Sequence, residues 1–237
     1  MKKPTTDLRA VSLLTRRVLD ACDWGALGAI YFHEDGEKFW AERRPAVVEL
    51  GERLARALLR RLPARGASLW VGAGVAELPV LLAETMVHER TVVAANLRGD
   101  ECDLLNRALA AAAPTASLQF VAGDARTLGG ATTFDHLGCI SVFTDPETWP
   151  VLSDVAYGRI APVQLDVERF VAERERAREL AHGLWARLRR PGLITTSAEE
   201  VPWFLEQAAA SGAVVDPDDE LIETAVVGDP VGFLAVR

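Results

Sequence analysis

A turn with two glycines is the first place in the sequence where residue types and spacing could do chemistry. It lies in the run Leu69-Trp70-Val71-Gly72-Ala73-Gly74-Val75-Ala76-Glu77-Leu78, where a short apolar segment leads into a helical pattern. Glycine lets the backbone turn sharply and lets a ligand approach without meeting a Cβ. In open α/β sheets the ligand crevice lies at the carboxyl ends of the strands, where the strand order reverses. Gly72, Ala73 and Gly74 therefore predict a ligand-binding turn, with a plain tight turn as the alternative.

The residue that follows this turn separates two classes of ligand. A dinucleotide site has the pattern Gly-x-Gly-x-x-Gly and places the pyrophosphate at the helix N-terminus. Glu77 stands at the third glycine position, where its carboxylate would repel a pyrophosphate and prevent close helix–strand packing. A cationic ligand without phosphate meets neither obstacle. The turn thus favours sulfonium chemistry, and a nicotinamide-dependent oxidoreductase is the less favoured enzyme.

The pattern of apolar runs predicts the sheet that would carry this turn. Strands are expected at 68–71, 91–95, 117–122, 135–143 and 193–197, and helices near 76–88, 100–113, 166–190 and 202–211. Fully apolar strands are typical of a parallel sheet with helices on both faces. The last two runs, 221–227 and 231–236, are joined by so few residues that they must pair antiparallel. We expect an α/β fold, a three-layer αβα sandwich whose seven-stranded, mostly parallel sheet ends in an antiparallel hairpin.

Two amphipathic helices are expected before the sheet. The first covers residues 5–22, and the second runs from about Pro45 to Leu62, with Pro45 in its first turn, where a missing N–H costs no hydrogen bond. Between them, Trp24 to Trp40 is interpreted as a loop rich in glycine and aromatic residues. The predicted domains are an N-terminal helical extension or lid, residues 1–65, and the α/β domain, residues 66–237.

From residue 66 to the end, the order and spacing of the motifs resemble the class I, Rossmann-like S-adenosylmethionine-dependent methyltransferases. The matching stretches are residues 68–84, residues 91–108, the run Leu118-Gln119-Phe120-Val121-Ala122-Gly123-Asp124-Ala125, the strand near 134–143 and the terminal hairpin. The resemblance implies S-adenosylmethionine as the cofactor. It also implies that Gly72, Ala73 and Gly74 wrap the methionine and ribose parts of that molecule.

The same resemblance assigns roles to the ends of the second and third strands. Asn96, followed by Leu97, falls where the family bonds the ribose hydroxyls. The Gly123-Asp124-Ala125 segment falls where the family holds the adenine edge. Asp124 would accept a hydrogen bond from the exocyclic amine, and Ala125 would offer its backbone N–H.

Two positions depart from the family pattern. The family has an acidic residue just before the glycine turn, where Trp70 stands, and usually another where Asn96 stands. Asn96 can accept a ribose hydroxyl through its carbonyl but lacks the charge-assisted strength of a carboxylate. These departures keep open a catalytically degenerate methyltransferase-fold protein with a binding or scaffolding role. A Trp70 side chain filling the methionine subsite would favour that alternative.

Asp145 is the candidate catalytic residue. It ends the run Ser141-Val142-Phe143-Thr144-Asp145-Pro146, where the family places residues that face the substrate. A carboxylate there could accept a proton from a substrate amine or hydroxyl, or orient that group. The alternative is that Asp145-Pro146 opens a turn. The charge run from Glu168 to Arg178 is interpreted as a solvated helix face rather than a binding site.

Composition narrows the class of protein. A chain of 237 residues that is 49% hydrophobic and 25% charged can bury a core. Its net charge of −8 disfavours a nucleic-acid partner, since such binding neutralises phosphates with Lys and Arg. Three scattered cysteines predict no metal site and a reducing compartment. We expect a cytoplasmic protein with a small-molecule substrate, no signal peptide and no membrane association; the sequence leaves a homodimer open.

Overall fold

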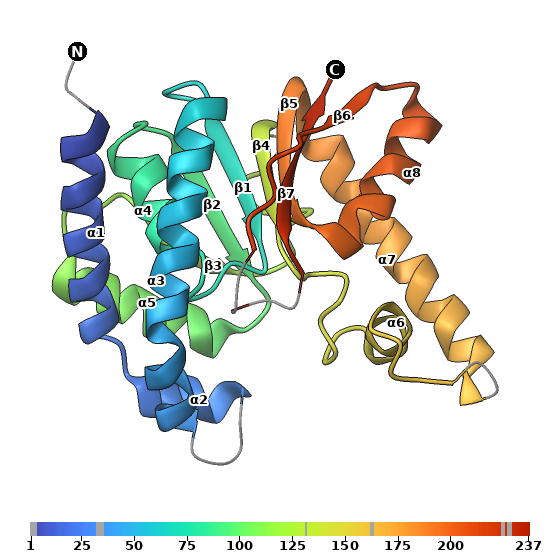
Figure 1. The fold of residues 1–237 in the computed structure, drawn as a ribbon, viewed down its shortest axis with the longest axis horizontal. Coiled ribbons are helices and arrows are strands. Elements are labelled where there is room, and N and C mark those ends of the chain that lie inside the picture. The colour runs from blue at the N-terminus through green and yellow to red at the C-terminus, as the bar shows by residue number, and fades with distance from the viewer. Residues whose placement is uncertain (1–3, 32–35, 131, 162–163, 224–225, 227–228) are drawn as a thin grey trace.

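A seven-stranded sheet forms the centre of the protein, and helices cover both of its faces (Figure 1). The computed structural model describes residues 4–31, 36–130, 132–161, 164–223, 226 and 229–237. The strands are β1 (Ala67–Val71), β2 (Thr91–Asn96), β3 (Phe120–Ala122), β4 (Phe134–Cys139), β5 (Leu188–Ser197), β6 (Val215–Pro217) and β7 (Val231–Val236). The α-helices are α1 (Pro4–Asp20), α2 (Trp24–Tyr31), α3 (Gly36–Arg61), α4 (Leu78–Met86), α5 (Gly99–Ala112), α6 (Pro150–Ala156), α7 (Val167–Arg187) and α8 (Val201–Ser211). This is the predicted α/β sandwich.

The strand order places the carboxyl ends of five parallel strands at one edge of the sheet. The order is β3-β2-β1-β4-β5-β7-β6, and the five strands from β3 to β5 pair parallel. β7 runs antiparallel to both β5 and β6. The chain moves outward from β1 through β2 to β3 and then returns to β4 on the other side of β1. The order therefore reverses between β1 and β4, and a crevice is expected at that point.

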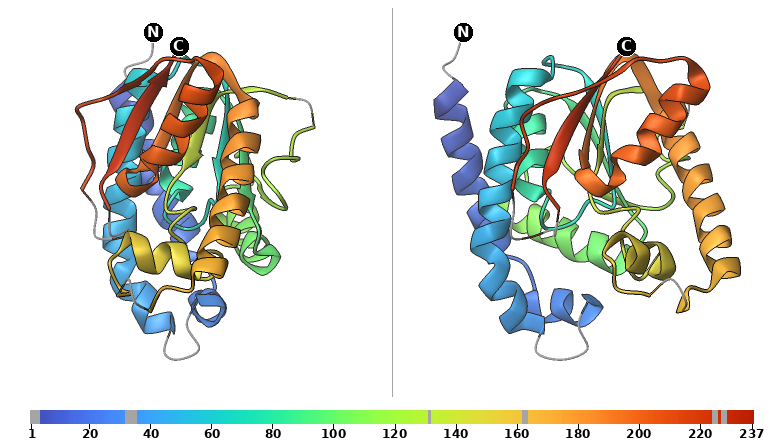
Figure 2. Two further views of the ribbon diagram at one scale, coloured as in Figure 1. Left: turned by 90° about the vertical axis from the view of Figure 1, so that its right-hand side faces the viewer. Right: turned by 45° about the vertical axis from the view of Figure 1, so that its right-hand side comes forward.

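Two hydrophobic layers separate the sheet from its helices. One layer is buried under α1, α3, α4 and α5, and the other under α6, α7 and α8. Figure 2 shows these two groups of helices on opposite sides of the sheet. Because successive strand residues point to opposite faces, Trp70 lies in the first layer while Leu69 and Val71 lie in the second. Among the described helices, none combines the length and the apolar character needed to cross a bilayer.

The prediction of a loop from Trp24 to Trp40 was wrong. α2 covers Trp24–Tyr31, and α3 begins at Gly36 and continues through Pro45, which is therefore an interior residue and not part of a first turn. Proline removes one backbone hydrogen bond, but this helix buries Val47 and Leu54 fully, and such packing supplies most helical stability in proteins. The boundary at residue 65 falls between α3 and β1, and the division into two domains stays a prediction.

The antiparallel hairpin is present, but its first arm was placed wrongly. The strand that forms the terminal hairpin with β7 is β6, at Val215–Pro217. The predicted strand over 221–227 contributes only the bridge from Ile222 to Val231 within the described part of that run. The chain from β6 follows the edge of β7, with Asp218 N–H donating to the Phe233 carbonyl before Ile222 makes its bridge. Pro217 faces Leu234 at a pair without backbone hydrogen bonds, so its missing N–H removes no bond to β7, and the ladder continues at Asp218.

Candidate functional site

A cavity of about 680 Å³ opens at the carboxyl ends of β1 to β4. Its volume is in the range of pockets that hold small ligands. It is bounded by the ends of the four strands, by the connection between β4 and α6, and by one side of α7. Seven of the predicted site residues line it: Gly72, Asn96, Leu97, Gly123, Asp124, Ala125 and Asp145. Ala73 and Gly74 lie outside its wall.

The glycine turn after β1 meets the cavity through its first residue. Gly72 has a left-handed φ of +67°, and a Cβ there would come within 3.0 Å of the Val142 side chain. The next two N–H groups of the turn are already engaged. Ala73 N–H donates to the Ala95 carbonyl at 3.0 Å, and Gly74 N–H donates to the Glu77 carboxylate at 2.8 Å. The conformation of the turn is therefore fixed by hydrogen bonds within the protein. A ligand can approach the backbone closely only at Gly72.

The buried carboxyl groups of Glu77 and Glu101 pack against the turn on the side away from the cavity. Glu101 approaches Gly74 so closely that a Cβ on that glycine would lie 2.6 Å from a carboxylate oxygen. The other Glu101 oxygen accepts hydrogen bonds from the Tyr31 hydroxyl at 2.6 Å and from the Asn96 amide at 2.9 Å. Burial raises the pKa of Glu77 to about 7 and also raises the pKa of Glu101. Tyr31 belongs to α2, so the N-terminal helices are tied directly to this turn.

Asn96 is held in place by three hydrogen bonds within the protein. Its Nδ2 donates to the Ala73 carbonyl and to Glu101, each at 2.9 Å, and its Oδ1 accepts from Arg98 N–H at 2.9 Å. Both amide hydrogens are therefore used, and one lone pair of Oδ1 is left for a ligand. Leu97, next in the chain, presents a 72% exposed side chain at the cavity.

Asp124 lies on the cavity wall at the end of β3 and is paired with a neighbour. The Arg126 guanidinium makes a two-pronged ion pair with its carboxylate at 2.5–3.0 Å, and Arg126 N–H donates to Oδ1 at 2.9 Å. This pairing lowers the pKa of Asp124. The carboxylate is ionised at neutral pH, and its remaining lone pairs can accept a further donor.

The Asp145 carboxylate caps a turn. It accepts hydrogen bonds from Thr148 Oγ1 at 2.5 Å, from Thr148 N–H at 3.2 Å and from Glu147 N–H at 3.3 Å. This turn leads into α6, a helix that the sequence did not predict. The geometry matches the turn-opening alternative, and a catalytic role for Asp145 stays a prediction.

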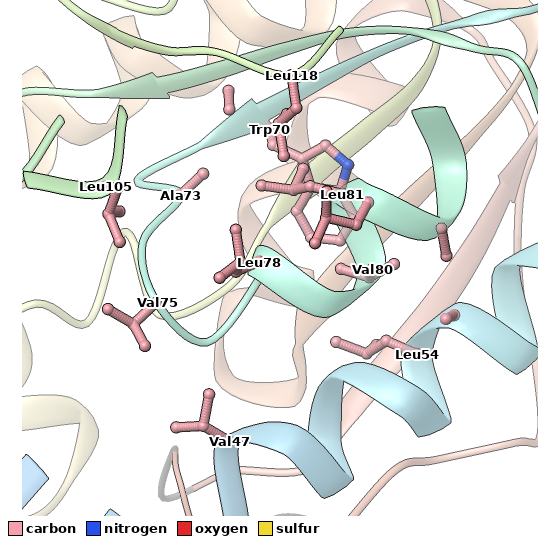
Figure 3. Close-up of a cluster of buried hydrophobic side chains, with 14 of the residues drawn as sticks. Val47, Leu54, Trp70, Ala73, Val75, Leu78, Val80, Leu81, Leu105 and Leu118 are labelled. Carbon is pink, nitrogen blue, oxygen red and sulfur yellow. The ribbon is translucent and has the colours of Figure 1, made fainter. Parts of the chain in front are cut away.

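Trp70 does not enter the cavity. Its side chain is fully buried among Leu78, Leu81 and other apolar residues on the face covered by α4 (Figure 3). The indole N–H donates to Glu84 at 2.8 Å, and the ring packs edge-on against His136 with centroids 5.3 Å apart. Trp70 pairs across the sheet with Gly138, where a Cβ would lie 2.2 Å from the ring. A glycine on the neighbouring strand thus makes room for the indole beneath the sheet.

The interpretation of residues 168–178 as a solvated helix face holds for most of the run, but it fails at Glu173, which is buried, and at Arg176, which lines the cavity. Arg176 lines the cavity, with its guanidinium 5.5 Å from the centre of the Trp149 ring. Glu173 is buried and accepts the N–H groups of Val151 and Leu152 at 2.9 and 3.0 Å, which caps α6. The spacing of charges along one helix does not show which other elements pack against it. The contacts of Glu173 with α6 and of Arg176 with Trp149 could therefore not be predicted from the sequence.

Three more residues of the site were missed. Ser141, after β4, takes a left-handed conformation with φ of +55°, which ends the strand earlier than predicted. Arg98 and Glu147 form an ion pair of 2.6 Å between two connections that border the cavity. Both charges were visible in the sequence, but their pairing depends on the strand order. Within the described ranges there is no cluster of three or more residues of the kinds that bind metal ions.

Comparison with known proteins supports the architecture. No family model matches the sequence, and no curated protein matches it. Among solved structures, precorrin-6y C5,15-methyltransferase from Geobacter metallireducens is similar with a TM-score of 0.50 and 12% identity, over 78% of this chain and 88% of that chain. TrmN from Thermus thermophilus matches with a TM-score of 0.51 and 18% identity, over 82% and 53%.

A third structure matches along the whole chain. A possible exported protein from Bordetella parapertussis has a TM-score of 0.51 and 13% identity, over 100% of this chain and 97% of that chain. Because the sequence identities are below 20%, these similarities show the fold alone. The strand order, the two helical layers and these structural neighbours agree: the chain has the fold of the class I, Rossmann-like methyltransferases, which the sequence motifs resemble.

Proposed function

We propose that this protein transfers a methyl group from S-adenosylmethionine to a small-molecule acceptor in the cytoplasm. The observation that carries the proposal is the cavity at the strand-order reversal, which brings together Gly72, Asn96 and Asp124 from three separate strand ends. The family resemblance had assigned these three positions to one ligand. Their common cavity has a suitable volume for it.

The residues present fit an adenosyl group at the β2 and β3 side of the cavity. Asp124 can accept the exocyclic amine, Ala125 can offer its N–H, and the exposed Leu97 side chain can cover the purine ring. Gly72 has no side chain to obstruct the approach of the ribose. Bound S-adenosylmethionine would supply a methyl group activated on its sulfonium.

The chain's own contribution to the reaction would be positioning. Methyl transfer is an in-line displacement, so holding donor and acceptor in line can supply much of the rate enhancement. Four carboxylates line the cavity (Asp124, Asp145, Glu147 and Glu179) together with three guanidinium groups (Arg98, Arg126 and Arg176), and the excess of one negative charge is compatible with a cationic ligand. The overall charge of −8 makes a small molecule a better acceptor candidate than a nucleic acid.

Calorimetric titration with S-adenosylhomocysteine tests the proposal. We expect saturable binding, and we expect Asp124→Ala to weaken it about 5-fold to 150-fold, because a lost partner for a buried amine costs about 1–3 kcal/mol. No detectable binding by the wild-type protein at millimolar ligand would contradict the proposal.

Two further variants isolate the role of Asp124. Asp216 is exposed and paired with Arg237 away from the cavity, so Asp216→Ala is a matched control that should bind normally. If Asp124 served only to hold Arg126, then Arg126→Ala would weaken binding as much as Asp124→Ala. We expect Arg126→Ala to retain affinity within a few-fold, because it removes a competitor for the carboxylate.

A binding or scaffolding protein is the second candidate. The internal hydrogen bonds of Gly74 and Asn96 favour it, because these groups would otherwise be free for a cofactor. The position of Trp70 outside the cavity gives it no support. Binding of S-adenosylhomocysteine without methyl transfer to any acceptor in a panel of amines, hydroxyls and thiols would favour this candidate.

A further inference from the structure

Three guanidinium groups line the cavity, and two of them are already paired within the protein. Arg126 forms an ion pair with Asp124, and Arg98 forms one with Glu147 at 2.6 Å. The third, Arg176, is an exposed residue of α7. Within the described part of the chain it forms no ion pair and no hydrogen bond. A ligand in the cavity could therefore supply the negative charge that this cation lacks.

The carboxylates of the same helix leave Arg176 unpaired. Residues three or four apart on a helix are neighbours, so Glu173 and Glu179 are the nearest candidates. The buried Glu173 carboxylate binds Arg169 and the first turn of α6 instead. Glu179 lines the cavity as well, but among the described contacts it forms no ion pair with Arg176. The guanidinium lies against an aromatic ring of the cavity wall and not against a neighbouring carboxylate.

That aromatic ring belongs to Trp149 and has a fixed orientation. The indole is buried, and its N–H donates to the Val142 carbonyl at 2.8 Å. The Arg176 guanidinium lies over the ring, 5.5 Å from its centre. Such a contact stabilises the cation while the N–H groups at the edge of the guanidinium stay free. Two of these groups can bind both oxygens of a carboxylate at once.

Helix geometry separates Arg176 from the place proposed for the purine. Gly183 packs closely on Arg126, the partner of Asp124, and a Cβ on Gly183 would lie 2.7 Å from the arginine side chain. Arg176 lies two turns earlier on the same helix face, about 10 Å away along the axis. Because α7 returns from the carboxyl edge of the sheet to the start of β5, its earlier residues lie farther out from the strand ends (Figure 1). A cofactor on the strand ends leaves Arg176 to a second molecule.

We propose that Arg176, supported by Trp149, binds a carboxylate of the methyl acceptor. The inference rests on the proposed function, which makes the second molecule in the cavity an acceptor. A carboxylate fits better than a phosphate, because the nearby Asp145, Glu147 and Glu179 repel a dianion more strongly than a monoanion. The substrate class is then narrowed to small carboxylic acids that carry a separate nucleophilic group.

The test measures binding of a simple carboxylate to the protein saturated with S-adenosylhomocysteine. The probe is benzoate, and its titration is followed by NMR. We expect saturable binding in the millimolar range, with neutral benzamide bound about 10-fold more weakly and phenyl phosphate bound no more tightly than benzoate. Arg176→Ala should weaken benzoate binding about 10-fold and abolish the preference for benzoate over benzamide.

Variants at three exposed positions of α7 separate this contact from a general effect of charge. Arg174 lies outside the cavity wall, so Arg174→Ala is the matched control and should bind benzoate like the wild-type protein. Arg176→Lys keeps the charge but loses the planar fork, so its affinity should lie between those of the wild-type protein and Arg176→Ala. Glu179→Gln removes a negative charge beside the site and should tighten benzoate binding a few-fold.

The outcomes distinguish this inference from the proposed function. If the wild-type protein binds S-adenosylhomocysteine but does not prefer benzoate to benzamide, the anion subsite is wrong and the proposed function stands. Equal losses for Arg174→Ala and Arg176→Ala, or tighter binding of phenyl phosphate than of benzoate, also overturn the inference. If Arg176→Ala weakens S-adenosylhomocysteine binding as much as benzoate binding, Arg176 contacts the cofactor and not the acceptor. If the wild-type protein does not bind S-adenosylhomocysteine, the proposed function fails and the acceptor assignment fails with it.

Discussion

Trp70→Ala is expected to lower the free energy of unfolding by about 3–5 kcal/mol, the usual cost of removing a large aromatic side chain from a core. The Trp70 indole is fully buried and donates its N–H to Glu84, so the alanine variant also deprives a buried carboxyl group of a donor. Urea denaturation measures the loss. Trp203, which is only partly buried, provides a control, and Trp203→Ala should cost clearly less.

Gly138→Ala should destabilise the protein through the same contact. Its new Cβ would overlap the Trp70 ring, and overpacking of this kind costs about 1–3 kcal/mol or more. Combining Gly138→Ala with Trp70→Leu should cost less than the sum of the two, because the smaller side chain removes the overlap. Folded Trp70→Leu should still bind S-adenosylhomocysteine. Loss of that binding with unchanged stability would show that the indole serves the cavity and not the core.

Raising the pH from 6.5 to 8.5 is expected to lower the free energy of unfolding by about 2–3 kcal/mol. Burial raises the pKa of Glu77 from 4.5 to about 7 and that of Glu200 from 4.5 to about 8. In the unfolded chain both carboxyl groups are already ionised at pH 6.5. The folded state therefore binds more protons across this window, so stability falls until the pH passes the pKa values of the folded state.

Below pH 6.5 a buried histidine acts in the opposite direction. Burial holds the pKa of His136 well below 6.5. As the pH falls below 6.5, the histidine is protonated in the unfolded chain but not in the folded protein, and the free energy of unfolding therefore decreases. Urea denaturation at pH 6.5, 7.5 and 8.5 isolates the glutamates. Glu77→Gln and Glu200→Gln should each flatten the profile, whereas Glu168→Gln, at an exposed position on α7, should not. A wild-type stability that is constant or rising over this range contradicts the prediction.

The parallel part of the sheet could be predicted because its strands are buried on both faces. Leu69, Val71 and Ala95 lie in continuous apolar runs, and such runs need no long-range information to be recognised as strands. The glycine turn and the Gly123-Asp124-Ala125 segment follow directly from these strands. Their meeting at one cavity is a consequence of the strand order, which the alternation of strands and helices already favours.

The errors occurred where tertiary packing overrides a local signal. Pro45 is a helix-start signal by its own chemistry, yet burial of Val47 and Leu54 carries α3 through it. The arm that pairs with β7 was misplaced because a three-residue strand containing Pro217 has almost no strand signal. Trp70 could not be assigned from the sequence, since only the register between β1 and β4 shows that it faces Gly138.

The hydrophobic layer under α1 and α3 has a consequence for how the chain is made. These helices precede α4 and α5 in the sequence, yet Val18, Leu27 and Leu54 are buried in a layer shared with Leu78, Leu81 and Leu105. During synthesis the apolar stripes of the early helices leave the ribosome before their partners exist. Ribosome-bound chains that end before residue 78 should therefore expose these apolar side chains, aggregate readily and depend on chaperones. Chains long enough for α5 to have left the ribosome should resist proteolysis.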